Sequence, residues 1–203
     1  MVQILLVTEN EAKLLDYLFR HYHEKLSING LAKNVEITPK GAYKILKKFE
    51  ADSLVVKEKI ANAQIYTLHF ANEKTEYLVK YMLKSAKAPN SYVKVLEQDL
   101  QILKEVVKGI IIFGSVLEKG MKAEDIDILV IIDKHKLNAL KLKIKEFEMI
   151  SPKKTHLVIQ TINDIQRNLQ KNDRVIAEIL QKGYIIYGHS LFYEVIKDDA
   201  NKK

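Results

Sequence analysis

Alternating acidic and branched apolar residues, Asp125-Ile126-Asp127-Ile128, open a stretch that stays apolar through Ile132. Successive side chains of a strand point to opposite faces, so both carboxylates share one face, about 7 Å apart along the strand. Two like charges on a buried strand are costly unless a cation neutralises them. Divalent ions that prefer oxygen ligands are suited to that role. The sequence therefore predicts a metal site at Asp125 and Asp127, against the alternative of a solvated strand end.

A second apolar run, Gly109–Phe113, ends in the pair Gly114-Ser115. Glycine lets the backbone approach a phosphate closely, and the N–H groups of a following helix favour an anion. A phosphate held beside metal-binding carboxylates is the geometry of two-metal phosphoryl or nucleotidyl transfer. Lys119, in the loop between the two motifs, either reaches a triphosphate as a point charge or is simply solvated.

The rest of the second half alternates strand and helix patterns. A third short apolar run covers 157–159, and helical spacing of apolar residues covers 136–148, 162–169 and 175–182. A longer helix is predicted over 92–107. Together these patterns predict a small α/β or α+β domain with a sheet of at least three strands. We expect this sheet to be mixed and the chain as a whole to be of the α+β class.

The first half has a different order of elements. Helices are predicted over 10–24, from Ser27, and from Thr38 to Asp52, where Thr38 is the cap and Pro39 takes the first helical position. Two β-type runs, 54–57 and 64–70, follow with a connection at 58–63. This order predicts a winged helix-turn-helix. Small and polar residues at 85–91 mark a boundary, giving predicted domains 1–86 and 87–203.

Lysines gather on the predicted third helix and the wing. Residues 39–59 hold six lysines and three acids, which is where a winged helix would meet DNA phosphates. The predicted DNA-binding residues are Lys40, Tyr43, Lys44, Lys47, Lys48 and Lys59. The alternative is a module that contacts only proteins, and a helix at 73–84 suggests a homodimer by analogy with other winged helices.

Composition narrows the class of protein further. The chain has no cysteine, which excludes a disulfide scaffold, thiolate metal ligands and a cysteine nucleophile. No run approaches the roughly 18 consecutive apolar residues of a membrane span. We therefore expect a soluble cytoplasmic protein with no membrane partner. The net charge of +7 admits a polyanionic partner without naming one.

Gly114-Ser115 and Asp125-Ile126-Asp127, ten residues apart, resemble the signature of the DNA polymerase beta superfamily, specifically its minimal nucleotidyltransferase domains. The resemblance covers about residues 90–190 and includes the segment 179–188. It implies an NTP held by Gly114 and Ser115, Mg²⁺ ions on Asp125 and Asp127 in a two-metal site, and nucleotidyl transfer to an acceptor hydroxyl.

His156 stands where the resemblance implies a third carboxylate. Imidazole is a poor ligand for Mg²⁺, although it can serve as a base near neutral pH. A surface position at the start of a strand is expected for His156, and a place lining the site is the alternative. Two hypotheses follow: an active nucleotidyltransferase with a DNA-binding winged helix, or a non-enzymatic winged-helix transcriptional regulator whose nucleotidyltransferase fold has degenerated.

Overall fold

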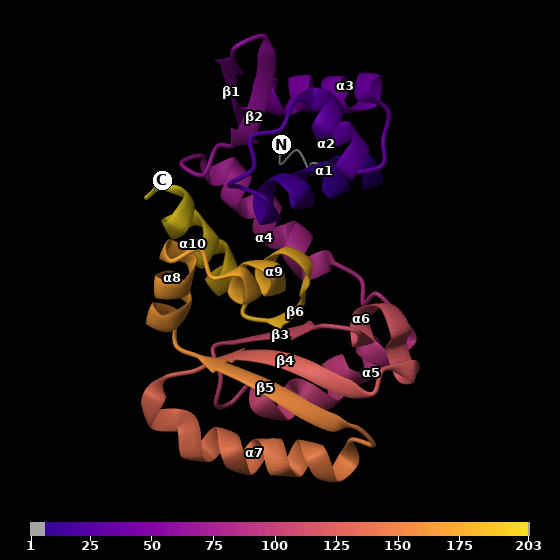
Figure 1. The fold of residues 1–203 in the computed structure, drawn as a ribbon, viewed down its shortest axis with the longest axis vertical. Coiled ribbons are helices and arrows are strands. Elements are labelled where there is room, and N and C mark those ends of the chain that lie inside the picture. The colour runs from indigo at the N-terminus through magenta and orange to yellow at the C-terminus, as the bar shows by residue number, and fades with distance from the viewer. Residues whose placement is uncertain (1–6, 203) are drawn as a thin grey trace, which may run out of the picture. The chain divides into compact units, whose positions relative to one another are not determined.

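The computed structural model describes residues 7–202. The chain divides into two compact units, the first ending at Ser85 and the second covering Ala86–Lys202. Figure 1 colours the chain from indigo at the amino terminus to yellow at the carboxy terminus.

The amino-terminal unit consists of helices and one β-hairpin. Its elements are α1 (Glu9–Arg20), α2 (Ile28–Asn34), α3 (Pro39–Ala51), β1 (Val55–Ile60), β2 (Ala63–Leu68) and α4 (Glu73–Ser85). The helix starts follow from their caps: the Thr38 hydroxyl accepts a hydrogen bond from the amide of Gly41 at 3.1 Å, next to Pro39 at the first position. Leu14 and Leu15 of α1 and Leu46 of α3 are fully buried in the core of this unit.

The hairpin differs from the sequence prediction. Residues 58–63 were expected to connect the strands, but Glu58–Ile60 belong to β1 and Ala63 begins β2. The connection is only Ala61-Asn62. The prediction was wrong because β1 is exposed beyond Val55 and so carries no apolar alternation that would mark it as a strand.

The carboxy-terminal unit is built on a four-stranded sheet. Its elements are α5 (Ser91–Asp99), η1 (Leu100–Leu103), β3 (Gly109–Phe113), α6 (Val116–Lys119), η2 (Gly120–Lys122), β4 (Asp125–Ile131), η3 (Lys134–Lys136), α7 (Leu137–Ile150), β5 (Lys154–Gln160), α8 (Ile162–Gln170), α9 (Arg174–Lys182), β6 (Tyr184–Tyr187) and α10 (His189–Ala200). The strand order is β5-β4-β3-β6, with β4 and β5 parallel and the other pairs antiparallel. The predicted mixed sheet is confirmed.

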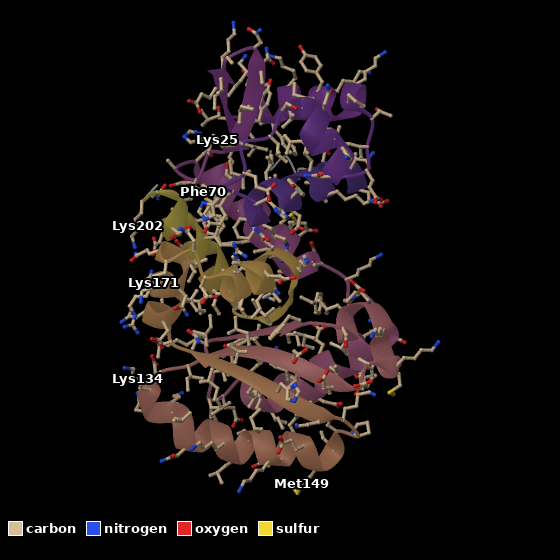
Figure 2. The ribbon with its side chains drawn as sticks, in the orientation of Figure 1. Lys25, Phe70, Lys134, Met149, Lys171 and Lys202 are labelled. Carbon is tan, nitrogen blue, oxygen red and sulfur yellow. The ribbon has the colours of Figure 1, made fainter. Side chains whose placement is uncertain are left out.

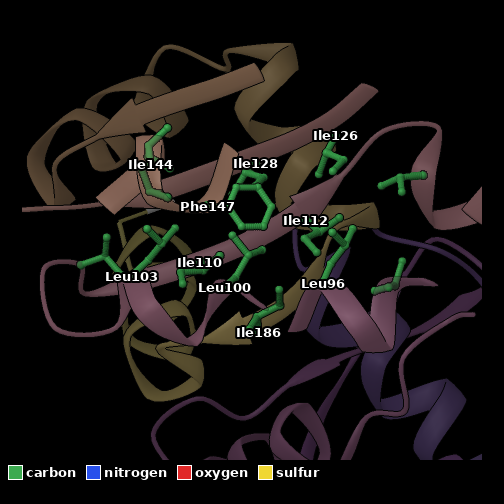
Figure 3. Close-up of a cluster of buried hydrophobic side chains, with 14 of the residues drawn as sticks. Leu96, Leu100, Leu103, Ile110, Ile112, Ile126, Ile128, Ile144, Phe147 and Ile186 are labelled. Carbon is green, nitrogen blue, oxygen red and sulfur yellow. The ribbon is translucent and has the colours of Figure 1, made fainter. Parts of the chain in front are cut away.

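The two faces of this sheet carry different side chains. On one face, isoleucines of β3 and β4 pack against α5, η1 and α7 in a core that includes Leu100 and Phe147 (Figure 3). Helices α8, α9 and α10 lie on the other side of the sheet (Figure 1). Burial of Ile126 and Ile128 in this core, each worth about 1.5–3 kcal/mol, places Asp125 and Asp127 on the opposite face, where Leu129 and Ile131 further along β4 are also fully buried.

One predicted helix boundary in this unit was wrong, and one strand was missed. The helix expected over 92–107 ends at Asp99 and continues only as a 3₁₀ turn to Leu103. The fourth strand, β6, was not predicted as a strand.

The outer side of α7 faces solvent, where Met149 is 79% exposed and extends away from the ribbon (Figure 2). Within residues 7–202, no helix is long and apolar enough to cross a membrane.

Candidate metal and nucleotide site

The start of β4 presents two carboxylates on the face opposite the isoleucine core. The side chains of Asp125 and Asp127 are 33% and 25% exposed. The adjacent strand β5 runs parallel, and its register places His156 beside Asp127. Neighbouring residues in register point to the same face of a sheet, so the imidazole joins the two acids.

The three side chains form one cluster. Nδ1 of His156 lies 3.3 Å from Oδ2 of Asp125 and 3.4 Å from Oδ1 of Asp127. One ligand atom from each residue falls within 4.8 Å of the other two, a spacing that suits a metal ion. His156 is 46% exposed near the start of β5, as expected for a surface histidine, and it also lines this cluster, which was the alternative expectation.

Gly114 follows directly after β3 and lies beside the cluster. Its backbone φ of +76° is one that other residues rarely adopt, and a Cβ atom built on it would lie 2.2 Å from Oδ2 of Asp127. Only glycine therefore lets the turn pass the carboxylate. Ser115 follows at the start of α6, where its carbonyl accepts a hydrogen bond from the amide of Lys119 at 2.8 Å.

A groove of about 630 Å³ adjoins this turn. It is lined by Phe113, Gly114, Ser115, Leu117, Glu118, Val175, Glu178, Ile179 and Lys182. The last turn of α9 forms one wall because Gly183 lets it approach the sheet: a Cβ there would lie 2.3 Å from Cγ2 of Ile111. Gly114 belongs to both the groove and the rim of the acidic cluster.

Several groove residues were missed by the sequence analysis. Glu118, Glu178 and Lys182 carry charge into the groove, but no motif marked them. Lys182 lies in the segment 179–188 that carried part of the resemblance, which was the only signal for it. Lys119, predicted to bind the triphosphate, is exposed and is not among the described residues that line the groove.

Carboxylates outnumber amines among the side chains that form the acidic cluster and line the groove. Lys182 Nζ lies 2.8 Å from Oε1 of Glu178, and this hydrogen bond raises the pKa of Lys182, with Glu118 adding a smaller effect. Asp125 and Asp127 have a single imidazole between them. A triphosphate entering here meets carboxylates on both sides, so its binding requires a cation to offset the repulsion.

The residues predicted to bind DNA lie on α3 and the hairpin. Tyr43 is 45% exposed, and Lys40, Lys44 and Lys59 are exposed and form no ion pair with any residue in 7–202. Lys47 lies 2.8 Å from Glu50, which also holds Lys57 at 3.1 Å.

Lys48 is held within the unit. Its Nζ lies 2.7 Å from Oε1 of the buried Glu11 on α1. Burial alone would raise the pKa of Glu11, but the hydrogen bonds from Lys48 and Thr8 outweigh it and lower the pKa. Lys48 therefore links α3 to α1 through an ion pair, whereas the sequence suggested an exposed lysine available to DNA.

The carboxy-terminal unit is thus a mixed α+β domain that carries a candidate divalent-cation site beside a glycine turn and a groove. Residues 93–183 match the family model of the nucleotidyltransferase domain. The matched segment contains the whole acidic cluster, His156 and the groove residues. A nucleotidyltransferase domain is therefore present in this chain. None of the curated proteins and none of the solved structures compared with the chain matches it.

Proposed function

We propose that the carboxy-terminal unit binds a nucleoside triphosphate together with a divalent cation and transfers a nucleotidyl group to an acceptor hydroxyl. The observation that carries the proposal is the fit of Gly114 against Asp127, which joins the acidic cluster to the groove within a nucleotidyltransferase domain. The excess of carboxylates supports it, because a polyanion could share this space only with a cation.

Each residue has a separate role in the proposal. Asp125 and Asp127 hold the cation, for which the family implies Mg²⁺, and their oxygen ligands fit that ion. Gly114 and Ser115 receive the triphosphate at the turn, and Lys119 reaches it from outside the groove. When bound, the cation neutralises charge on the phosphates.

The transfer step needs no covalent intermediate. The acceptor oxygen forms a bond to the α-phosphorus while the bond from that phosphorus to the bridging oxygen breaks. Pyrophosphate leaves, and the acceptor hydroxyl gives its proton to water. Positioning of the reactants and charge neutralisation supply the catalysis.

A transfer assay tests this proposal. Purified protein is incubated with an NTP labelled in its α-phosphate, a divalent cation and cell extract, and labelled products are separated. Wild type and the Asp133→Asn control, which changes an acid at the far end of β4, are expected to yield product. Asp125→Asn and Asp127→Asn are expected to yield none. If wild type gives no labelled product, the enzymatic hypothesis fails.

We propose further that the amino-terminal unit is a winged helix that binds double-stranded DNA. Three helices followed by a hairpin support it, as does an isolated β-bridge between Ser27 and Ile65 that adds a short third partner to the hairpin. Exposed Lys40, Lys44 and Lys59 supply the charge for phosphate contacts. Duplex binding should weaken steeply as salt is raised, and affinity that does not change with salt would refute the proposal.

The alternative proposal is a non-enzymatic transcriptional regulator. His156 in place of a third carboxylate is the observation that favours it. In that case Asp125→Asn and Asp127→Asn leave duplex binding intact, and no extract yields a labelled product. Duplex binding together with product formation would instead favour the enzyme.

A homodimer through α4 is a separate proposal. Tyr77 and Tyr81 on that helix are 72% and 66% exposed, one helical turn apart. Sedimentation should then show a dimer in the wild type and a monomer for Tyr77→Glu with Tyr81→Glu. A monomeric wild type would refute it.

A further inference from the structure

We infer that Asp125, Asp127 and His156 form a site for a first-row divalent transition-metal ion, of the class of Co²⁺ or Zn²⁺, in preference to Mg²⁺. The inference rests on the proposed function, because two of the three ligands are the carboxylates assigned there. It concerns the identity of the ion, for which the family alone implies Mg²⁺.

The distances from His156 to the two acids are those of ligands around a common ion. Two atoms that each lie about 2.1 Å from a metal are roughly 3.0 Å apart at neighbouring corners of an octahedron and roughly 3.4 Å apart in a tetrahedron. Nδ1 of His156 lies 3.3 Å from one carboxylate oxygen and 3.4 Å from the other. Ordinary N–H···O hydrogen bonds measure about 2.7–3.2 Å. The imidazole thus stands at ligand spacing from both acids.

The donor set decides which ion is preferred. Mg²⁺ binds oxygen ligands and keeps much of its hydration shell, so a ring nitrogen adds little to its affinity. Imidazole suits zinc, nickel and iron, and affinities of mixed nitrogen and oxygen sites rise along the first transition row. One nitrogen between two carboxylates therefore favours the transition-metal ion.

The scaffold holds this donor set in place. Asp127 and His156 are in register on paired parallel strands, so their backbones cannot move apart without breaking the sheet. Gly114 packs against Asp127 from the neighbouring strand. Partial exposure of all three side chains leaves a path for the ion to enter.

A metal titration without nucleotide tests the inference. Tag-free protein is titrated with CoCl₂ and separately with MgCl₂ by calorimetry, and the visible absorption of bound Co²⁺ is recorded. Wild type should bind Co²⁺ at least about tenfold more tightly than Mg²⁺. His156→Asp should weaken Co²⁺ binding by about tenfold or more, strengthen Mg²⁺ binding and shift the Co²⁺ spectrum.

Two further variants control the experiment. His135→Asp makes the same replacement at an exposed histidine outside the cluster, and it should change neither affinity. His156→Gln removes the imidazole without adding charge and should also weaken Co²⁺ binding, with thermal melting used to show that each variant is folded.

Three results would overturn the inference: no Co²⁺ binding by wild type, equal affinity for Co²⁺ and Mg²⁺, or unchanged Co²⁺ affinity in both His156 variants. The proposed function is tested separately, because nucleotide is absent from these titrations. If NTP failed to bind protein supplied with either ion, nucleotidyl transfer would be refuted while the metal preference stood.

Discussion

The carboxylate of Asp127 occupies the space that a side chain at Gly114 would need. A Cβ atom on Gly114 would lie 2.2 Å from Oδ2 of Asp127, well inside contact distance. The positive φ of Gly114 adds a second constraint, because left-handed backbone costs other residues about 1–2 kcal/mol. The glycine turn and the acid proposed to bind the metal are therefore fitted to each other across two strands.

Gly114→Ala should damage the metal site more than the fold. We expect a loss of about 1–2 kcal/mol in the free energy of unfolding from the backbone strain, and displacement of Asp127 that abolishes Co²⁺ binding. Thermal unfolding and metal titration measure the two effects. Gly30→Ala is the matched control, since its nearest neighbour would be 3.4 Å away. Co²⁺ binding by Gly114→Ala at wild-type affinity would contradict the assigned fit.

Asp164 should stabilise the start of α8, and this stabilisation should be lost at acid pH. Its Oδ2 accepts hydrogen bonds from Oγ1 of Thr161 at 2.7 Å and from the Thr161 amide at 3.0 Å. These bonds, with Arg167 beside them, lower the pKa of Asp164 to about 2. Asp164→Ala should cost about 1 kcal/mol at neutral pH.

Acid should remove that difference between Asp164→Ala and wild type. The folded pKa lies below the ordinary value of 3.8, so the stabilisation is complete above pH 3.8 and is lost as the pH falls toward 2. Chemical unfolding across this range measures it. Glu148→Ala, at an exposed acid of α7, should have little effect at any pH. A gap between Asp164→Ala and wild type that stayed constant down to pH 2 would contradict the assignment.

The phenol of Tyr184 should lose its proton only at high pH, and its hydrogen bond should link β6 to α5. Its hydroxyl lies 3.2 Å from Oε2 of Glu97 and 3.3 Å from the carbonyl oxygen of Ala86. Burial, together with the charge of Glu97, raises the pKa of Tyr184 to about 12. The neutral phenol is favoured in the folded state, so its stabilisation is complete below pH 10 and is lost as the pH rises toward 12.

In a tyrosinate absorbance titration of the folded protein, Tyr184→Phe should remove one phenol that loses its proton only at high pH. The variant should also lose about 1 kcal/mol in the free energy of unfolding below pH 10. Tyr17, whose pKa is also raised to about 12, should still titrate late in this variant. Tyr77→Phe removes an exposed phenol and serves as the control. If the phenol missing from the Tyr184→Phe titration were instead one that loses its proton near the ordinary pKa, Tyr184 would be accessible to solvent.

Charge reversal on α3 should weaken duplex binding. Lys40→Glu with Lys44→Glu removes two cations that form no ion pair with any residue in 7–202, so the affinity for DNA and the slope of its salt dependence should both fall, the slope by about two phosphate contacts. Binding is measured by fluorescence anisotropy over a range of salt concentrations. Lys74→Glu with Lys84→Glu makes the same change in net charge on α4. Equal losses in the two double variants would indicate a general charge effect and no binding face on α3.

Strong local signals predicted the parts of the fold that the structure bears out. Isoleucines at alternate positions of β4 favour a buried strand, so this strand and the shared face of Asp125 and Asp127 could be predicted from the sequence. The start of α3 could also be predicted, because Thr38 caps the first turn and Pro39 is tolerated at the first helical position.

The remaining parts depend on long-range pairing. The place of His156 is set by the parallel register of β5 against β4 across the intervening helix, which no local pattern encodes. The groove depends on how closely Gly183 brings α9 to β3. Strand β6 covers only Tyr184–Tyr187, too short a run for a periodic signal.

The central claim is that the acidic cluster and the groove form one metal-dependent nucleotide site. Calorimetry of NTP binding tests it most directly, in chelator and then with Mg²⁺ or Co²⁺ supplied, for wild type, Asp127→Asn and the Asp133→Asn control. We predict that wild type and the control bind NTP only with a divalent cation, and that Asp127→Asn does not bind it under any of these conditions. NTP binding that is unaffected by chelator, or that persists unchanged in Asp127→Asn, would contradict the account.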